Sequence, residues 1–219
     1  MALPDPIEMP QPLPVNSKLF ELSYNQNVSP AGSHFSQTIE RAKPSWIAKY
    51  DTPALTPERL MPFQAFLDAL EGSMNAFLAF DPRRPRPWAY RGVGGEPWLR
   101  SGQAAVQVTA GDYANSTISL RYFADGAIIS YGDYISHKIG KAWYLYRSKE
   151  NRIVPSGGVV SSLKVNLRPI NFSGQAYPAR LVRACCAMKV VGSVSSSDNV
   201  EDVGPKYSFT AGQFIDRSL

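Results

Sequence analysis

The side chains most often used for catalysis or metal binding are sparse in this sequence of 219 residues. Its two histidines, His34 and His137, share no metal-ligand spacing, and the HExxH pattern of zinc hydrolases is absent. No GxSxG elbow marks a nucleophilic serine. We interpret both histidines as ordinary surface or core residues. We therefore predict no catalytic residues, no metal and no cofactor, and a protein that is not an enzyme.

The two cysteines are sequence neighbours, Cys185 and Cys186, within the apolar stretch Leu181–Val191. Successive residues of a strand point to opposite faces, so the two thiols cannot line one metal site or pair comfortably with each other. We interpret both as small buried side chains. Asp68 and Glu71 could be imagined as a glycosidase pair, but both lie on the polar face of a predicted helix, where carboxylates are normally solvated.

The densest group of cations lies between residues 83 and 91, in a chain of net charge +5. Phosphate binding needs several cations on one face, and no recognised nucleic-acid motif adjoins this run. Interleaved prolines favour a stiff, solvated, polyproline-like connector, with arginines that face outward or towards a protein neighbour. The following glycine turn lacks the strand-to-helix context of a phosphate loop. The residues are Arg83, Arg84, Arg86 and Arg91, with Pro82, Pro85 and Pro87, then Gly92, Gly94 and Gly95.

Aromatic side chains are dense between residues 120 and 146. They could stack on sugars or bases, as on an oligonucleotide-binding barrel. We favour the interpretation that they form a barrel core and a subunit contact. A carbohydrate-binding module stays open as an alternative, and it would lose glycan binding when Trp143 or Tyr146 becomes alanine. The aromatic residues are Tyr122, Phe123, Tyr131, Tyr134, Trp143, Tyr144 and Tyr146.

One segment, about residues 56–72, has a clear helical pattern. Thr56 is a good N-cap, and Pro57 fits the first helical position. Pro62 removes a backbone hydrogen bond, so we expect a distorted or separate first turn and a regular helix from about Pro62 to Glu71. The apolar residues recur at helical spacing on one face. They are Leu60, Phe63, Phe66, Leu67 and Leu70.

Strand-like segments fill most of the remaining chain. Charged residues make up 19% of the sequence, below the ~25% typical of soluble domains, and proline (18) and glycine (16) are frequent. Short β-favouring runs at near-regular spacing predict small barrels or sandwiches. A polar loop or protruding hairpin is expected over Gly192–Gly204. The predicted strands are Phe20–Tyr24, Phe35–Ile39, Trp46–Tyr50, Asn75–Phe80, Ala105–Thr109, Thr117–Phe123, Ala127–Tyr131, Tyr134–Ser136, Trp143–Arg147, Ile153–Pro155, Val159–Val165, Leu181–Val191 and Tyr207–Thr210.

The first residues are rich in proline, which cannot donate to a strand ladder, so we expect an extended arm that reaches along a neighbour. This segment lacks the basic start and apolar core of a secretory signal. No apolar run approaches the ~20 residues needed to span a bilayer. We therefore expect no membrane association, and a chain kept in the cytosol until assembly. The arm prolines are Pro4, Pro6, Pro10, Pro12 and Pro14.

The order of several short motifs resembles one known family. The motifs are Ser45-Trp46-Ile47 in an early strand, Leu60…Phe63-Gln64-Ala65-Phe66-Leu67…Leu70-Glu71-Gly72 in the helix, Phe77-Leu78-Ala79-Phe80-Asp81-Pro82, Gly132-Asp133-Tyr134-Ile135, Trp143-Tyr144-Leu145-Tyr146, Val165-Asn166-Leu167-Arg168-Pro169 and Ala179-Arg180-Leu181-Val182. Together they are similar to the distal tail proteins, or tail-tip ring proteins, of siphophages and related prophages. The resemblance covers about residues 45–185. The proline-rich arm and the segment after Cys185 depart from it.

The resemblance implies a mostly β fold with two domains. A β-sandwich or split-barrel ring domain with one helix, at about residues 56–72, is expected over residues 18–95 and 170–219. A second small β-barrel is expected over residues 96–169. A proline-rich arm is expected over residues 1–17.

The resemblance also implies a structural role in the virion. Six copies would form a ring in the phage tail tip, between the tail tube protein and the central hub or baseplate, with DNA passing through the channel without specific binding. The chain would be in the host cytoplasm during assembly. The expected subunit-interface residues are Ala65, Ala69, Pro10, Pro12 and Pro14. Another tail or baseplate subunit (tail tube or terminator), a carbohydrate-binding module and a tail-associated wall hydrolase stay open as alternatives.

Overall fold

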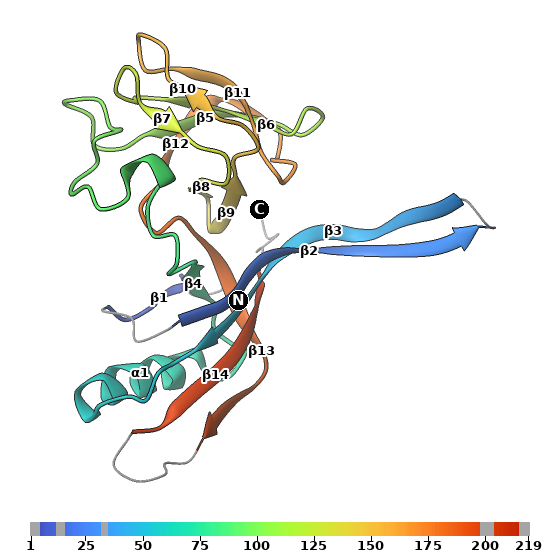
Figure 1. The fold of residues 1–219 in the computed structure, drawn as a ribbon, viewed down its shortest axis with the longest axis vertical. Helices are drawn as coiled ribbons and strands as arrows, with labels where there is room; N and C mark the ends of the chain where they lie inside the picture. The colour runs from blue at the N-terminus through green and yellow to red at the C-terminus, as the bar shows by residue number, and fades with distance from the viewer. Residues whose placement is uncertain (1–4, 12–15, 32–34, 198–203, 215–219) are drawn as a thin grey trace. The chain divides into compact units, whose positions relative to one another are not determined.

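A computed structural model describes residues 5–11, 16–31, 35–197 and 204–214 of the chain. This part is mostly β, with one α-helix and three sheets, as the sequence predicted (Figure 1). It forms two compact units. The chain passes between them within strand β4 (Phe77–Phe80) and again within strand β13 (Cys185–Ser197). Unit 1 contains the described residues up to Phe77 and from Met188 to Phe214, and unit 2 contains Leu78–Ala187.

The predicted domain boundaries, after residues 95 and 169, differ from the places where the units separate. Unit 2 begins at Leu78 and ends at Ala187. The reason is pairing: Ala179 and Arg180, which the sequence assigned to the ring domain, pair with β8 inside unit 2. The assignment of these parts as a ring domain and a small barrel stays a prediction.

Unit 1 is built on a six-stranded sheet with the order β1-β4-β13-β14-β3-β2. The C-terminal strand β14 completes the sheet by lying between β13 and β3 and pairing antiparallel with both. Its pairing with β3 runs from Ser208 opposite Asp51 to Gly212 opposite Ile47. The strands introduced here are β1 (Ile7–Glu8), β2 (Asn16–Ala31), β3 (Phe35–Asp51) and β14 (Lys206–Gln213).

Strands β2 and β3 form a long antiparallel ribbon that continues past the sheet (Figure 1). Its register shifts between the pairs Ser23–Ser45 and Asn25–Ala42, where β3 contains one more residue than β2. Pro44 lies inside this bulge, and it has no N–H to donate to the ladder. The sequence predicted three separate short strands here and missed that they join into one ribbon.

The predicted helix is present as α1, which spans Pro57–Leu70 without a break. The expectation of a separate first turn was wrong. Pro62 removes a single backbone hydrogen bond, the one to the carbonyl of Glu58, and this loss does not interrupt the helix. Phe63 and Phe66 follow directly and are buried, so packing onto the sheet stabilises this turn.

The C-terminal end of α1 has left-handed backbone at two successive residues. Glu71 has φ 47°, and its N–H donates to the carbonyl of Asp68 at 3.0 Å. Gly72 follows with φ 69°, which glycine adopts without strain. The face of α1 opposite the core is exposed, and Met61 retains 73% of its accessible surface.

The core of unit 1 is a cluster of aromatic rings between α1 and the sheet. Phe66 meets Phe77 edge-on, with ring centroids 5.7 Å apart and planes at 90°. Tyr50 and Phe63 pack against Phe209 at centroid distances of 5.4 and 6.4 Å. Aromatic contacts of this kind add to the large apolar area that each ring buries. The cluster joins the middle of the chain to its C-terminal strand.

Unit 2 is built on a six-stranded antiparallel sheet with the order β11-β6-β5-β12-β8-β9, curled into a half-barrel (Figure 1). A two-stranded sheet, β10-β7, and a short 3-10 helix, η1, accompany it. The bounds are η1 (Trp88–Tyr90), β5 (Gln107–Asp112), β6 (Thr117–Arg121), β7 (Ile128–Ile129), β8 (Tyr134–Ile139), β9 (Ala142–Arg147), β10 (Arg152–Ile153), β11 (Val160–Lys164) and β12 (Phe172–Arg180).

Most predicted strands of unit 2 are present, but two expectations differ from the structure. Strand β12, Phe172–Arg180, was not predicted, because glycine and proline interrupt its sequence pattern. The predicted strand Leu181–Val191 begins four residues late, at Cys185. A turn precedes it, in which Arg183 has φ 48° and donates its N–H to the carbonyl of Pro85. Strand β13 then continues to Ser197 through the stretch predicted as a loop or hairpin, and pairs with β14.

The proline-rich arm lies partly within the described residues. Ile7 and Glu8 form the edge strand β1, and the N–H of Ile7 donates to the carbonyl of Ala76 at 2.9 Å. Met9 is buried. This part of the arm therefore belongs to the sheet of unit 1, in the edge position that proline allows. Pro12 and Pro14 lie outside the described residues.

Candidate functional site

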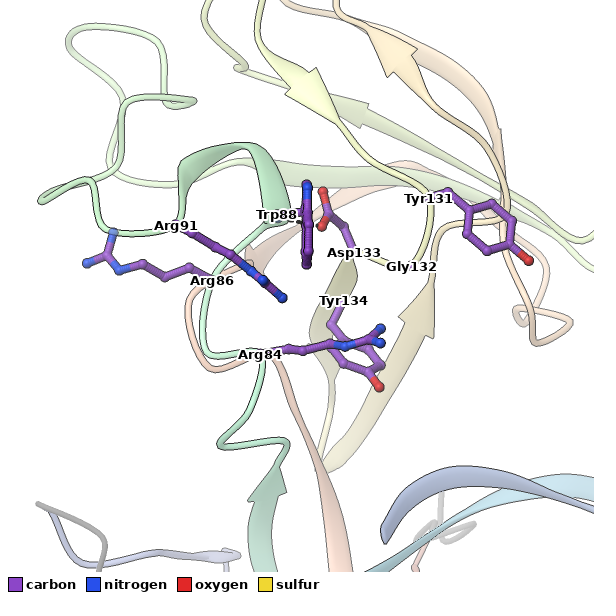
Figure 2. A pocket seen from close by; sticks show the side chains of 8 residues that line it. All are labelled: Arg84, Arg86, Trp88, Arg91, Tyr131, Gly132, Asp133 and Tyr134. Atoms are coloured by element: carbon purple, nitrogen blue, oxygen red, sulfur yellow. Dashed lines mark hydrogen bonds between the residues drawn. The ribbon is translucent and has the colours of Figure 1, made fainter. Parts of the chain in front are cut away.

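The arginine-rich segment and the turn before β8 line a small pocket in unit 2 (Figure 2). Its cavity volume is about 20 Å³, enough for one water-sized group. The pocket combines cationic, aromatic and acidic side chains, and two stretches that are far apart in the sequence supply them. The lining residues are Arg84, Arg86, Trp88, Arg91, Tyr131, Gly132, Asp133 and Tyr134.

Asp133 holds the two stretches together. Its Oδ1 accepts a hydrogen bond from the N–H of Trp88 at 2.7 Å, and its Oδ2 accepts one from the N–H of Ser130 at 2.7 Å. Burial raises the pKa of this carboxyl above its ordinary value, while the two N–H groups and the charges of Arg84 and Arg91 act in the opposite direction. Asp133 lies in the connection between β7 and β8, and its hydrogen bond to Trp88 also fixes the start of η1.

Two arginines of the segment are oriented by specific contacts. The guanidinium carbon of Arg91 lies 3.4 Å from the centroid of the Trp88 ring, and Trp88 retains 59% of its accessible surface. Arg86 Nη1 donates to the carbonyls of Val93 and Gly95, at 2.9 and 2.6 Å. Figure 2 shows the end of the Arg91 side chain beside the Trp88 ring, which is seen edge-on.

The remaining two arginines, Arg83 and Arg84, make different contacts. Arg83 makes a bidentate ion pair with Asp81, with contacts of 2.9 and 3.1 Å. Arg84 Nη1 lies 3.4 Å from the place that a Cβ on Gly132 would occupy. Figure 2 shows the guanidinium of Arg84 beside the ring of Tyr134.

The expected polyproline-like connector is therefore wrong as a description of residues 82–90. These residues fold through turns and the 3-10 helix η1. The prolines fix φ at the turns, and side-chain contacts of the arginines with carbonyls, carboxylates and rings hold the segment in place. A pattern of alternating arginine and proline does not specify these partners: Asp81 and Trp88 are local, Val93 and Gly95 follow the segment, and Asp133, which holds the Trp88 N–H, comes from the turn before β8.

This pocket can attract a small anionic group. Two guanidinium groups lie beside one carboxylate, so the local charge is positive, and arginine offers a planar pair of donors to an anion. The small volume admits a side-chain tip or a single ion. Sequence reasoning identified the arginines but missed the pocket, since the tyrosines and Asp133 are supplied by the turn before β8.

The sequence also singled out His137, which is a core residue in the structure. Its side chain lies among the rings of Tyr144, Tyr146, Phe172 and Tyr177, at centroid distances of 5.5 to 6.0 Å. Within the described part of the chain, neither ring nitrogen has a hydrogen-bond partner. Burial lowers the pKa of His137 to about 4, so the ring is neutral at pH 7. His34 lies outside the described residues.

Cys185 and Cys186 are buried thiols, which confirms the interpretation as small core residues. Burial, with the neighbouring Cys185 as a second cause, raises the pKa of Cys186 well above its ordinary value, so it is a protonated thiol. Asp68 and Glu71 are exposed on and just after α1, as predicted for solvated carboxylates.

The aromatic region of residues 120–146 is largely core, as the sequence predicted. Trp143 and Tyr146 retain 8% and 1% of their accessible surface. Burial raises the pKa of the Tyr146 hydroxyl. Neither ring forms an open platform for stacking on a sugar. Tyr131 is the exception in this region, with 68% of its surface exposed.

A second cleft, with a cavity volume of about 460 Å³, lies on the half-barrel of unit 2. The β-ladders that join β5, β6, β11 and β12 each shift register near it. Sequence reasoning missed this cleft, since bulges of this kind depend on the pairing of strands that are distant in the sequence. Its lining is mostly small and polar: Ala110, Gly111, Asp112, Thr117, Ser119, Ser162, Asn171, Phe172 and Ser173.

Two of the predicted interface residues, Ala65 and Ala69, are exposed on α1. They lie four residues apart, as does Met61 from Ala65, so the three form one stripe on the outer face. Pro10 is partly exposed next to the buried Met9. Contacts of these residues with a second copy stay a prediction.

No group of three or more histidine, cysteine, aspartate or glutamate side chains in the described ranges could hold a metal ion. In the same ranges, no helix is long and apolar enough to cross a membrane. No family model matches the sequence, and no curated protein matches it.

Proposed function

We propose that this chain is a structural subunit of a virus particle, which forms a ring in the tail tip of a bacteriophage and joins the tail tube to the central hub or baseplate. The proposal includes a ring of six copies through which DNA passes. It treats unit 1 as a split-barrel ring domain and the half-barrel of unit 2 as a small β-barrel module. The observation that carries the proposal is the long ribbon of β2 and β3.

The ribbon of β2 and β3 extends beyond the residues that pair with the rest of the sheet. Strand β14 pairs with β3 only over Ile47–Asp51, whereas β2 pairs with β3 as far as Ala31 opposite Phe35. Beyond Trp46, whose N–H donates to the side chain of Gln213, the strand pairing seen within the described residues is that of β2 with β3. A two-stranded ribbon is marginally stable alone in water, and its open edges favour pairing with another chain. A ring of identical subunits supplies a neighbour at every position.

The outer face of α1 gives a second, weaker line of support. Met61 is exposed, and Ala65 and Ala69 continue its stripe with small side chains that allow a second backbone to approach closely. This stripe and the ribbon both belong to unit 1. Ring contacts made by unit 1 leave unit 2 available for other contacts.

The alternatives gain less support. The aromatic residues suggested for sugar stacking, Trp143 and Tyr146, are core residues, so replacing them with alanine would disturb folding instead of testing glycan binding. A tail tube or terminator subunit would also use a ribbon between copies. Only the position of the protein within the particle separates that alternative from a tail-tip ring.

The proposal is tested by the assembly state of the full chain. Electron microscopy with sedimentation velocity should show six-fold rings. A variant in which residues 27–39 are replaced by Asn-Gly shortens the ribbon, and a two-residue turn of this type matches the twist of paired strands. This variant should not form rings, because the ribbon surface between copies is lost.

A matched control keeps the ribbon and changes unit 2. The substitution Ile153→Ser alters an exposed residue of β10 and should leave the rings intact. Circular dichroism and the fluorescence of buried Trp46 report whether the shortened chain still folds. Rings that persist without the ribbon, or a folded full chain that remains monomeric and digests cell-wall material, would contradict the proposal.

A further inference from the structure

We propose that the pocket of Arg84, Trp88 and Arg91 in unit 2 is a docking site for an acidic segment of a protein partner, whose carboxylate enters between the two guanidinium groups. This site is separate from the ring contacts and does not depend on them. It concerns a surface that belongs entirely to one unit.

The pocket is cationic. Arg84 and Arg91 both act electrostatically on Asp133, so all three lie close together, with two positive charges against one negative charge. Asp133 already accepts hydrogen bonds from two backbone N–H groups, which occupy both of its oxygens. Both oxygens of the Asp133 carboxylate therefore already have a hydrogen-bond donor within the chain. Arg86, the third arginine of the lining, donates to the carbonyls of Val93 and Gly95, and the lining as a whole keeps a positive charge that attracts a carboxylate.

The pocket is small. Its volume of about 20 Å³ admits the planar tip of a carboxylate. A tetrahedral phosphate needs more room than the planar tip of a carboxylate, so the small volume favours the carboxylate. Nucleic acid is disfavoured further, because phosphate tracking needs several cations along one face, and Arg83 is already paired with Asp81.

Exposed aromatic and apolar side chains lie near the pocket. Trp88 and Tyr131 are largely exposed at its rim, and tryptophan, tyrosine and arginine are the residue types that dominate binding energy in protein interfaces. Ile128 and Ile153, directly opposite each other in the small sheet, are also exposed. The Ile128 N–H donates to the Tyr90 hydroxyl, so this apolar pair lies next to η1. Aromatic and apolar groups around a cationic centre suit a protein segment.

Arg91 is held in place before any ligand binds. Arg91 lies on the Trp88 ring, and the backbone N–H of Trp88 is fixed by Asp133. An arginine that is already stacked loses less side-chain freedom when it binds an anion than a free arginine does. Arg91 would act from a rigid base, because it directly follows η1 and η1 is tied to the turn before β8.

The test uses the full chain and fluorescence anisotropy at physiological salt. The probe is a fluorescein-labelled, capped decapeptide of glutamate, leucine and serine, and its control has glutamine in place of glutamate. The glutamate peptide should bind at least about tenfold more tightly, because charged hydrogen bonds to arginine are lost in the control. Arg84→Gln with Arg91→Gln should weaken binding of the glutamate peptide by about tenfold or more.

The matched control variant is Arg168→Gln. Arg168 is an exposed arginine of the same unit, and its guanidinium lies 5.4 Å from the centroid of the Tyr113 ring, so the substitution removes one positive charge and a ring contact outside the pocket. Binding should then change by less than about twofold. Circular dichroism verifies that each variant is folded.

Several results would overturn the inference. Equal binding of the glutamate and glutamine peptides would show that the charge is not recognised. Tighter binding of labelled oligothymidylate, or displacement of the peptide by inorganic phosphate at a lower concentration than by acetate, would assign the pocket to phosphate. No measurable binding of the glutamate peptide, or equal losses in Arg168→Gln and in the double variant, would also reject it. None of these outcomes bears on ring formation, which sedimentation measures separately.

Discussion

The neutral, buried His137 predicts that unit 2 loses stability when the pH falls from 7.5 to 5. The ring has none of its surface exposed, and burial lowers its pKa from an ordinary 6.5 to about 4. Between these two values the unfolded chain binds a proton that the folded chain does not. Stability is therefore fully present above pH 6.5 and falls as the pH decreases through that value.

The magnitude follows from the two pKa values. At pH 5 the unfolded histidine is almost fully protonated and the folded one is mostly neutral, so His137 lowers the free energy of unfolding by about 2 kcal/mol relative to pH 7.5. Below pH 4 the loss would level off at about 3.4 kcal/mol. A phenylalanine at this position has no proton to bind, and it replaces a ring whose nitrogens make no hydrogen bond within the described residues. His137→Phe should therefore remove this part of the pH dependence.

The assay must report on unit 2 alone, because two units need not unfold together. Labelling with 5-fluorotryptophan gives each tryptophan its own ¹⁹F signal, and Trp98 and Trp143 lie in the core of unit 2. Urea titrations at pH 7.5 and 5 then give the free energy of unfolding of the wild type and of His137→Phe.

The quantity that tests the reasoning is the stability difference between the two proteins. It should grow in favour of His137→Phe by about 2 kcal/mol from pH 7.5 to pH 5. Other titrating groups, including Asp133 and Glu150, are the same in both proteins and cancel. A difference that stays constant within about 0.5 kcal/mol would mean that His137 has an ordinary pKa in the folded chain, and the assignment of a neutral core histidine would be wrong.

Two further predictions concern backbone geometry. Gly158→Ala would place a Cβ 2.2 Å from the carbonyl oxygen of Phe123 and should cost about 3 kcal/mol, whereas its neighbour Gly157 faces open space, so Gly157→Ala should cost about 1 kcal/mol for its left-handed backbone. Equal losses of unfolding free energy in urea would contradict the contact. Glu71→Gly should stabilise unit 1 by about 1 kcal/mol by relieving left-handed backbone at the helix end, seen as a higher urea midpoint for the Trp46 signal; an unchanged midpoint would contradict it.

Local sequence patterns predicted most elements of this fold. The apolar spacing from Leu60 to Leu70 and the cap at Thr56 were enough to predict α1, because a helix is stabilised by contacts within a few residues and by one apolar face. Short alternating runs predicted many strands of unit 2 for the same reason. The expected break at Pro62 was wrong, since packing against the sheet outweighs one missing hydrogen bond.

Features that depend on pairing between distant segments were not predictable in this way. The ribbon of β2 and β3 and the position of β14 between β13 and β3 require strand partners that a local pattern does not specify. Strand β12 was missed because its sequence is broken by glycine and proline, and it forms through its pairing with β5 and β8.

The arginine pocket shows the same division between sequence and structure. Composition alone identified a cationic segment between Arg83 and Arg91 and the absence of a recognised phosphate-binding motif around it. The tertiary structure decided which of these arginines line a pocket, because the opposite side of that pocket, with Asp133, comes from a turn more than forty residues away. Charge is a property of the chain, whereas the arrangement of charges into a site is a property of the fold.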